Sequence, residues 1–95
     1  MDGQVPVLTV VHAPACHLCD DAVEALREIA AVQPLRVEVV ELESPEGRRL
    51  AAEHRPAMNP LVLLDGARFS AGRLPRRKLL KALAERSRRA AAGAR

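Results

Sequence analysis

The chain contains few of the residues that build large aromatic cores or disulfide scaffolds. It has no Trp, no Tyr and one Phe among 95 residues, so its core must consist of Leu, Val, Ile and Ala. Two cysteines are too few for a secreted fold held by several disulfides. No run approaches the ~20 apolar residues of a membrane span, and residues 1–4 lack the basic and apolar parts of a signal peptide. We therefore expect one folded domain in the reducing cytoplasm, with no membrane partner.

Acidic and basic residues are unevenly distributed along the chain. Residues 1–47 hold nine acidic and two basic residues, whereas residues 48–95 hold three acidic and thirteen basic ones. Such a basic half attracts anionic partners in some proteins. No nucleic-acid-binding motif accompanies it here. We interpret it as a solvated helix face followed by a basic tail, and we expect no nucleic-acid partner.

Both cysteines lie in one short stretch, Cys16-His17-Leu18-Cys19, between an apolar run at 5–11 and a helical pattern at 20–31. The first turn of a helix presents unpaired N–H groups and the positive end of the helix dipole. A thiol placed there is stabilised as the thiolate, which is the form that attacks disulfides. Cys19 follows one turn later on the same helix face. The spacing predicts a reversible disulfide, with Cys16 as the nucleophile and Cys19 as the resolving thiol.

The rest of the chain alternates between strand and helix patterns. Apolar or alternating runs predict strands, and 3.6-residue periodicity predicts helices, in the order strand (7–11), helix (16–31), strand (35–42), helix (45–55), strand (61–64), strand (67–70) and helix (75–89). Ser44 is the expected N-cap of the second helix, and Asp65-Gly66 is a strong hairpin turn. The strand–helix–strand start implies parallel pairing. The pattern predicts an α/β fold of order β-α-β-α-β-β-α, with helices on both faces of a four-stranded mixed sheet. The domain is expected to span 1–90, with a frayed basic tail at 91–95.

This order resembles the glutaredoxin branch of the thioredoxin superfamily. The resemblance is carried by Cys16-His17-Leu18-Cys19 after the first strand, Pro60 at the start of the third, and Gly72 after the fourth. The chain is most similar to small bacterial glutaredoxin-like proteins with a Cys-His-Leu-Cys motif. The resemblance implies a monomeric thiol–disulfide oxidoreductase whose only redox group is the cysteine pair. It also implies a substrate that is a disulfide-bearing protein or a low-molecular-weight thiol, and a reductant that is glutathione or a flavoprotein.

The resemblance also implies a substrate site around the cysteines and a cis peptide bond between Asn59 and Pro60. The predicted substrate-binding residues are His17, Leu18, Met58, Asn59, Pro60, Gly72 and Arg73. The upstream base, the tyrosine and the acidic pair that glutaredoxins use to hold glutathione have no counterpart in this sequence. We therefore expect weak recognition of glutathione.

Two other functions remain open from the sequence. A zinc- or copper-binding module would need His12, His17 or His54 to complete the ligand set of a single CxxC motif. A redox-inactive interaction domain would keep the cysteines only for packing. His17 either stabilises the neighbouring thiolate or points into water, and we interpret His12 and His54 as structural or surface residues.

Overall fold

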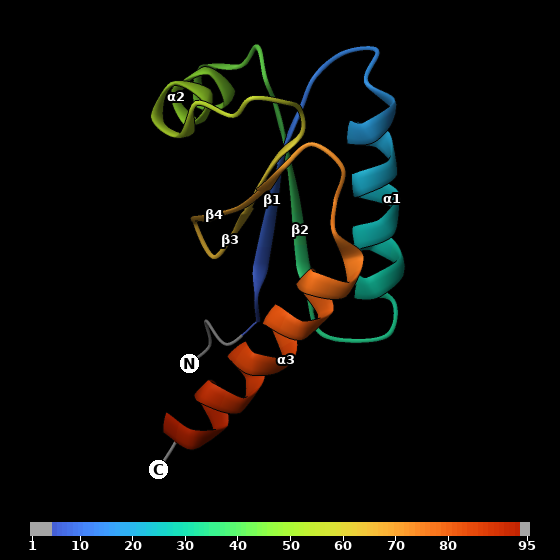
Figure 1. Ribbon diagram of the computed structural model, residues 1–95, viewed down its shortest axis with the longest axis vertical. Helices are drawn as coiled ribbons and strands as arrows, with labels where there is room; N and C mark the ends of the chain where they lie inside the picture. The colour runs from blue at the N-terminus through green and yellow to red at the C-terminus, as the bar shows by residue number, and fades with distance from the viewer. Residues whose placement is uncertain (1–4, 94–95) are drawn as a thin grey trace.

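The computed structural model describes residues 5–93 (Figure 1). Seven elements follow one another: β1 (Val7–His12), α1 (His17–Ala30), β2 (Arg36–Glu41), α2 (Pro45–His54), β3 (Leu61–Leu64), β4 (Ala67–Ala71) and α3 (Arg76–Gly93). This is the predicted β-α-β-α-β-β-α order. None of the helices within the described residues is long and apolar enough to cross a membrane.

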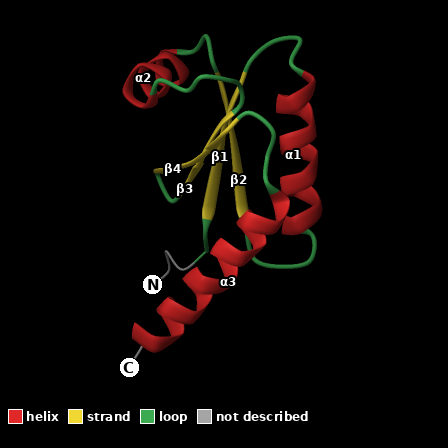
Figure 2. Cartoon of the chain, in the orientation of Figure 1, coloured by secondary structure: helices red, strands yellow, loops and turns green. Residues whose placement is uncertain are grey.

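The four strands form one mixed sheet in the order β2-β1-β3-β4. β1 runs parallel to β2 and antiparallel to β3, and β3 pairs antiparallel with β4. Val11 near the end of β1 lies opposite Leu61 at the start of β3, and Leu61 lies opposite Ala71 at the end of β4. The loop after β1, the residues before β3 and the residues after β4 therefore meet at one end of the sheet (Figure 2). That end carries both cysteines.

The sheet has a hydrophobic core on each face because successive side chains of a strand point to opposite sides. On one face α1 and α3 pack against β1 and β3, and the buried residues are Leu8, Val10, Ala22, Ala25, Leu26, Ile29, Val62, Leu74, Leu79 and Leu83. On the other face α2 covers a smaller cluster of Val11, Leu50, Leu61 and Leu63. Each fully buried leucine or valine stabilises the fold by about 1.5–3 kcal/mol. The predicted four-stranded sheet with helices on both faces is confirmed.

Local signals in the sequence set the turns as predicted. The Ser44 Oγ accepts a hydrogen bond from the Gly47 N–H at 3.0 Å and so caps α2. Asp65 and Gly66 both have positive φ angles, 52° and 86°, which is the geometry of the predicted hairpin turn. Gly72, with a φ of 95°, takes a left-handed backbone conformation that favours glycine.

The last helix differs from the prediction because it continues to Gly93, three residues into the tail that was expected to be frayed. Residues 90–92 are alanines, the strongest helix formers, and they favour the added turn. Glu85 supports this part of α3 through ion pairs with Arg88 and Arg89, three and four residues later. Residues 94–95 of that tail, like residues 1–4, lie outside the described part of the chain.

Candidate functional site

Cys16 is the N-cap residue of α1, with extended backbone angles (φ −121°, ψ 103°). Its Sγ accepts a hydrogen bond from the Cys19 N–H at 3.1 Å, as the oxygen of a capping serine would. The thiol is half-buried, so a reagent from solvent can reach it. Both this N–H and the helix dipole favour negative charge on the sulfur. The structure thus places the Cys16 sulfur at the N-terminus of α1, with one backbone N–H donating to it.

The loop before Cys16 holds an unusual backbone conformation. Ala15 has a φ of 52°, in the left-handed region that residues other than glycine seldom adopt. Such a conformation costs about 1–2 kcal/mol. Residues held this way cluster at functional sites. The turn at Ala15 carries the chain from the end of β1 to the start of α1, so that the next residue caps the helix.

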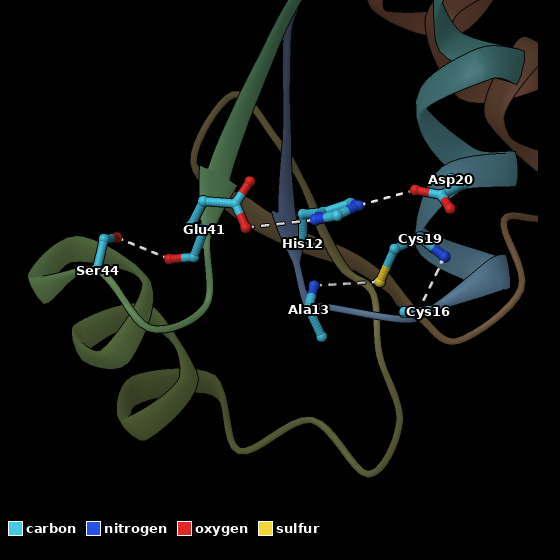
Figure 3. Close-up of polar contacts among 7 residues, drawn as sticks. All are labelled: His12, Ala13, Cys16, Cys19, Asp20, Glu41 and Ser44. Carbon is cyan, nitrogen blue, oxygen red and sulfur yellow. Dashed lines mark hydrogen bonds and ion pairs between the residues drawn. The ribbon is translucent and has the colours of Figure 1, made fainter.

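Cys19 lies in a different environment one turn further along α1. Its side chain is fully buried, and its Sγ accepts a hydrogen bond from the Ala13 N–H at 3.4 Å (Figure 3). Burial above all raises the pKa of the Cys19 thiol to about 11; the Ala13 N–H opposes this shift, whereas Cys16 and Asp20 add to it. Both thiols are free. The pair is therefore asymmetric, with one accessible thiol and one buried thiol.

Gly72 adjoins two other predicted substrate-site residues, Met58 and Pro60, near this end of the sheet. The Asn59-Pro60 peptide bond is cis, as predicted, and the carbonyl of Pro60 accepts a hydrogen bond from the Gly72 N–H at 3.0 Å. The exposed Met58 side chain lies over Gly72, where an added Cβ would be 3.5 Å from the Met58 Sδ. The loop before β3 and the loop after β4 are thus joined by one hydrogen bond and one side-chain contact.

Two more predicted residues, Leu18 and Arg73, line a cavity of about 330 Å³ between α1 and the start of α3. Leu18 is half-buried and Arg73 is exposed. The cavity also carries charges of both signs, from Asp21 and Arg76 among others. His17, the first residue of α1, is exposed. The structure thus places Leu18 and Arg73 on the wall of one cavity, while His17 faces solvent.

A three-residue polar cluster beside the cysteines was not predicted from the sequence. The His12 Nε2 lies 2.9 Å from the Asp20 Oδ1, and its Nδ1 lies 3.4 Å from the Glu41 Oε1 (Figure 3). The hydrogen bond to Asp20 above all raises the pKa of His12; partial burial opposes this shift, and Glu41 adds to it. The parallel register of β1 and β2, which places His12 opposite Glu41, is the signal that would have found the cluster. His12 is therefore a bridging residue of the site.

The nitrogen ligands that a metal module would need lie in different places. His12 is engaged by two carboxylates, and His54 lies half-buried near the end of α2. Within residues 5–93, no three His, Cys, Asp or Glu side chains are grouped so that they could hold a metal ion.

No protein-family model and no curated protein matches the chain. Solved structures do match it: a mutant thioredoxin from Halobacterium salinarum (17% identity, TM-score 0.63, 87% of this chain and 75% of that one) and the thioredoxin Mala s 13 from Malassezia sympodialis (17% identity, TM-score 0.62, 88% and 79%). A thioredoxin from Thermus thermophilus matches with 24% identity and a TM-score of 0.54 over 87% of this chain and 74% of that one. At these identities the likeness concerns the fold alone, and it does not distinguish glutaredoxin-like proteins from other proteins with the same fold. The chain has the thioredoxin fold.

Proposed function

We propose that the protein is a glutaredoxin-like thiol–disulfide oxidoreductase in which Cys16 is the nucleophile and Cys19 the resolving thiol. The observation that carries the proposal is the hydrogen bond from the Cys19 N–H to the Cys16 Sγ at the start of α1. It gives the accessible sulfur a donor that stabilises the thiolate, and it brings the second cysteine within one helical turn. The thioredoxin fold supports the same activity by analogy only.

The proposed reaction moves two electrons from the dithiol to a substrate disulfide. The Cys16 thiolate attacks one substrate sulfur, forms a mixed disulfide and releases the other substrate sulfur as a thiolate. Cys19 then loses its proton and attacks the Cys16 Sγ. This step breaks the mixed disulfide, releases the second substrate thiolate and leaves a Cys16–Cys19 disulfide. The released thiolates take up the two protons of the dithiol, and an external thiol or flavoprotein supplies two electrons to reset it.

The substrate in this proposal is a disulfide-bearing protein or a low-molecular-weight thiol disulfide, met in a reducing compartment such as the cytoplasm. Its backbone would lie along Met58, Asn59 and Pro60 at the sheet end that carries the cysteines. Gly72 would lie on the same side as Met58 and Pro60, which it adjoins, and Leu18 and Arg73 would extend the path toward α1. Apart from Arg73, these contacts involve backbone and apolar groups, so we expect broad recognition of sequence.

The proposal is tested by counting thiols and by trapping substrate. A mild oxidant should lower the free thiols from two to none while the protein stays monomeric. Cys16→Ser should abolish turnover, whereas Cys19→Ser should accumulate a mixed disulfide with the substrate because the resolving thiol is absent. A disulfide-linked dimer as the main oxidation product, or turnover that survives Cys16→Ser, would contradict the proposal.

The reductant can be tested in the same preparation. We expect activity coupled to glutathione to be far below activity coupled to a flavoprotein reductase, because the sequence lacks the residues with which glutaredoxins hold glutathione. Turnover that saturates at low glutathione concentration would show that other residues build a glutathione pocket.

A further inference from the structure

We propose that His12 is a positioning residue for the resolving step, because it holds the Asp20 carboxylate in an ion pair and so prevents its charge from opposing ionisation of Cys19. The inference rests on the proposed function of the dithiol. It assigns a role to a histidine whose side chain bonds to Asp20 and Glu41. Among the described residues, the His12 ring forms no hydrogen bond to either cysteine.

Each partner of the ion pair is next in sequence to a residue of the hydrogen bond between the Ala13 N–H and the Cys19 Sγ. Asp20 directly follows Cys19 on α1, and His12 directly precedes Ala13, whose N–H donates to the Cys19 Sγ. The bridge between His12 Nε2 and Asp20 Oδ1, 2.9 Å long, therefore joins the end of β1 to the helical turn that carries the thiol (Figure 3). The negative charge of Asp20 acts on Cys19, where it raises the pKa of the thiol.

The resolving step needs such help because the thiol that must ionise is buried. Burial above all raises the pKa of Cys19 to about 11, and the negative charge of Asp20 adds to this shift to a smaller extent. Of the two negative charges that raise the pKa of Cys19, the one on Cys16 is absent in the mixed disulfide. The charge on Asp20 remains and disfavours the Cys19 thiolate. A protonated imidazole on that carboxylate cancels most of its field, because opposite charges in contact act on a nearby group as a dipole.

The other charged groups around His12 decide how long the imidazole stays protonated. Glu41 from β2 faces its second ring nitrogen at 3.4 Å. Glu24, Arg27 and Glu28 from α1 line the same groove, of about 740 Å³, as the cluster. The His12 side chain is 22% exposed, so solvent screens these more distant groups better than the two direct partners. The contacts with Asp20 and Glu41 raise the pKa of His12 and favour the imidazolium.

A purely structural role for His12 predicts something different from an electrostatic one. If the imidazole only ties α1 and β2 to β1, its loss should harm the site whatever the charge of Asp20. If it neutralises Asp20, removal of that carboxylate should make the imidazole dispensable. The double variant His12→Gln with Asp20→Asn separates the two, since both amides retain polar groups of similar size.

The experiment is a stopped-flow reaction with Ellman's reagent, whose coloured thiolate is released twice. Attack by Cys16 releases the first equivalent, and attack by Cys19 on the mixed disulfide releases the second. At neutral pH, His12→Gln should slow the second phase about three- to tenfold and change the first phase less. Asp20→Asn should leave the second phase as fast or faster, and the double variant should match it. Glu41→Gln is the matched control: it removes the carboxylate that faces the other ring nitrogen of His12 and leaves the contact between His12 and Asp20 in place, so it should slow the second phase less than His12→Gln does.

The pH profile gives a second readout. The second phase should be faster in the parent than in His12→Gln. This difference in rate should be full at low pH and should vanish as pH rises through the raised pKa of His12. A second phase unchanged in His12→Gln, or equally slow in the double variant, would overturn the inference while the proposed function stands. A parent protein that releases no second equivalent would overturn both.

Discussion

Among the glycines of residues 5–93, Gly47 is the one where an added methyl group should cost the most stability, because α2 lies against the end of β2 there. A Cβ built on Gly47 would lie 2.0 Å from the Glu41 carbonyl oxygen, 2.8 Å from the Glu41 carbonyl carbon and 2.8 Å from the Leu42 Cα. All three are backbone atoms, so no rotamer change can relieve the overlap. Gly47→Ala must therefore push the start of α2 away from β2.

The expected cost follows from two opposing contributions. Overpacking a buried site typically costs about 1–3 kcal/mol, and the lack of yielding atoms places Gly47 at the upper end of that range. Alanine gains up to about 1 kcal/mol of helix propensity over glycine. We expect a net loss of about 1–2 kcal/mol in the free energy of unfolding. For a domain of this size, that loss lowers Tm by about 4–16 °C.

The assay is urea unfolding followed by far-UV circular dichroism, since the chain has no Trp or Tyr to report by fluorescence. Gly93→Ala is the matched control: it is also a helical glycine, but no heavy atom lies within 4 Å of its added Cβ. It should leave the urea midpoint unchanged or raise it slightly. A Gly47→Ala protein as stable as the parent would refute the close approach of α2 to β2.

Three further predictions concern stability. Leu26→Ala should cost about 2–5 kcal/mol, because Leu26 is fully buried, whereas Val32→Ala, at a side chain 81% exposed, should change the urea midpoint little. Ser44→Ala should cost about 1 kcal/mol by removing the cap of α2, measured in the same assay. The ion pairs of His12 raise its pKa above 6.5, so their stabilisation should be complete below that pH and lost as pH rises through the folded value. His12→Gln should lack this dependence in urea midpoints measured across the range, and an identical pH profile for the two proteins would contradict it.

The parts of the fold that were predictable from sequence are those set by short-range interactions. A serine before a proline fixes the start of α2, and Asp65-Gly66 fixes a hairpin because few residue pairs tolerate two positive φ angles. Cys16 could be placed at a helix start for the same reason, since the apolar run and the helical pattern flank it directly. These interactions lie within four or five residues, so the sequence contains both partners in one window.

The parts that were missed depend on which distant segments meet. The bridge of His12 to Glu41 spans 29 residues and exists only because β1 and β2 pair in one particular register. The left-handed Ala15 has no local signal, because alanine does not prefer that conformation. Glycine lowers the stability of a helix, and at Gly47 only the packing of α2 on β2 explains why this residue is present.

Burial, together with the hydrogen bond to Cys16, sets the order of events in the proposed reaction. Each sulfur accepts one backbone N–H, from Cys19 for Cys16 and from Ala13 for Cys19. Both sulfurs therefore have a donor, and they differ in access: Cys16 is half-buried, whereas Cys19 is fully covered and its pKa is raised to about 11. A substrate disulfide can reach only Cys16, while the mixed disulfide formed there lies one helical turn from Cys19. In the proposed reaction, burial thus favours Cys16 for the first attack, and it leaves the second attack to a thiol whose ionisation a neighbouring positive charge would assist.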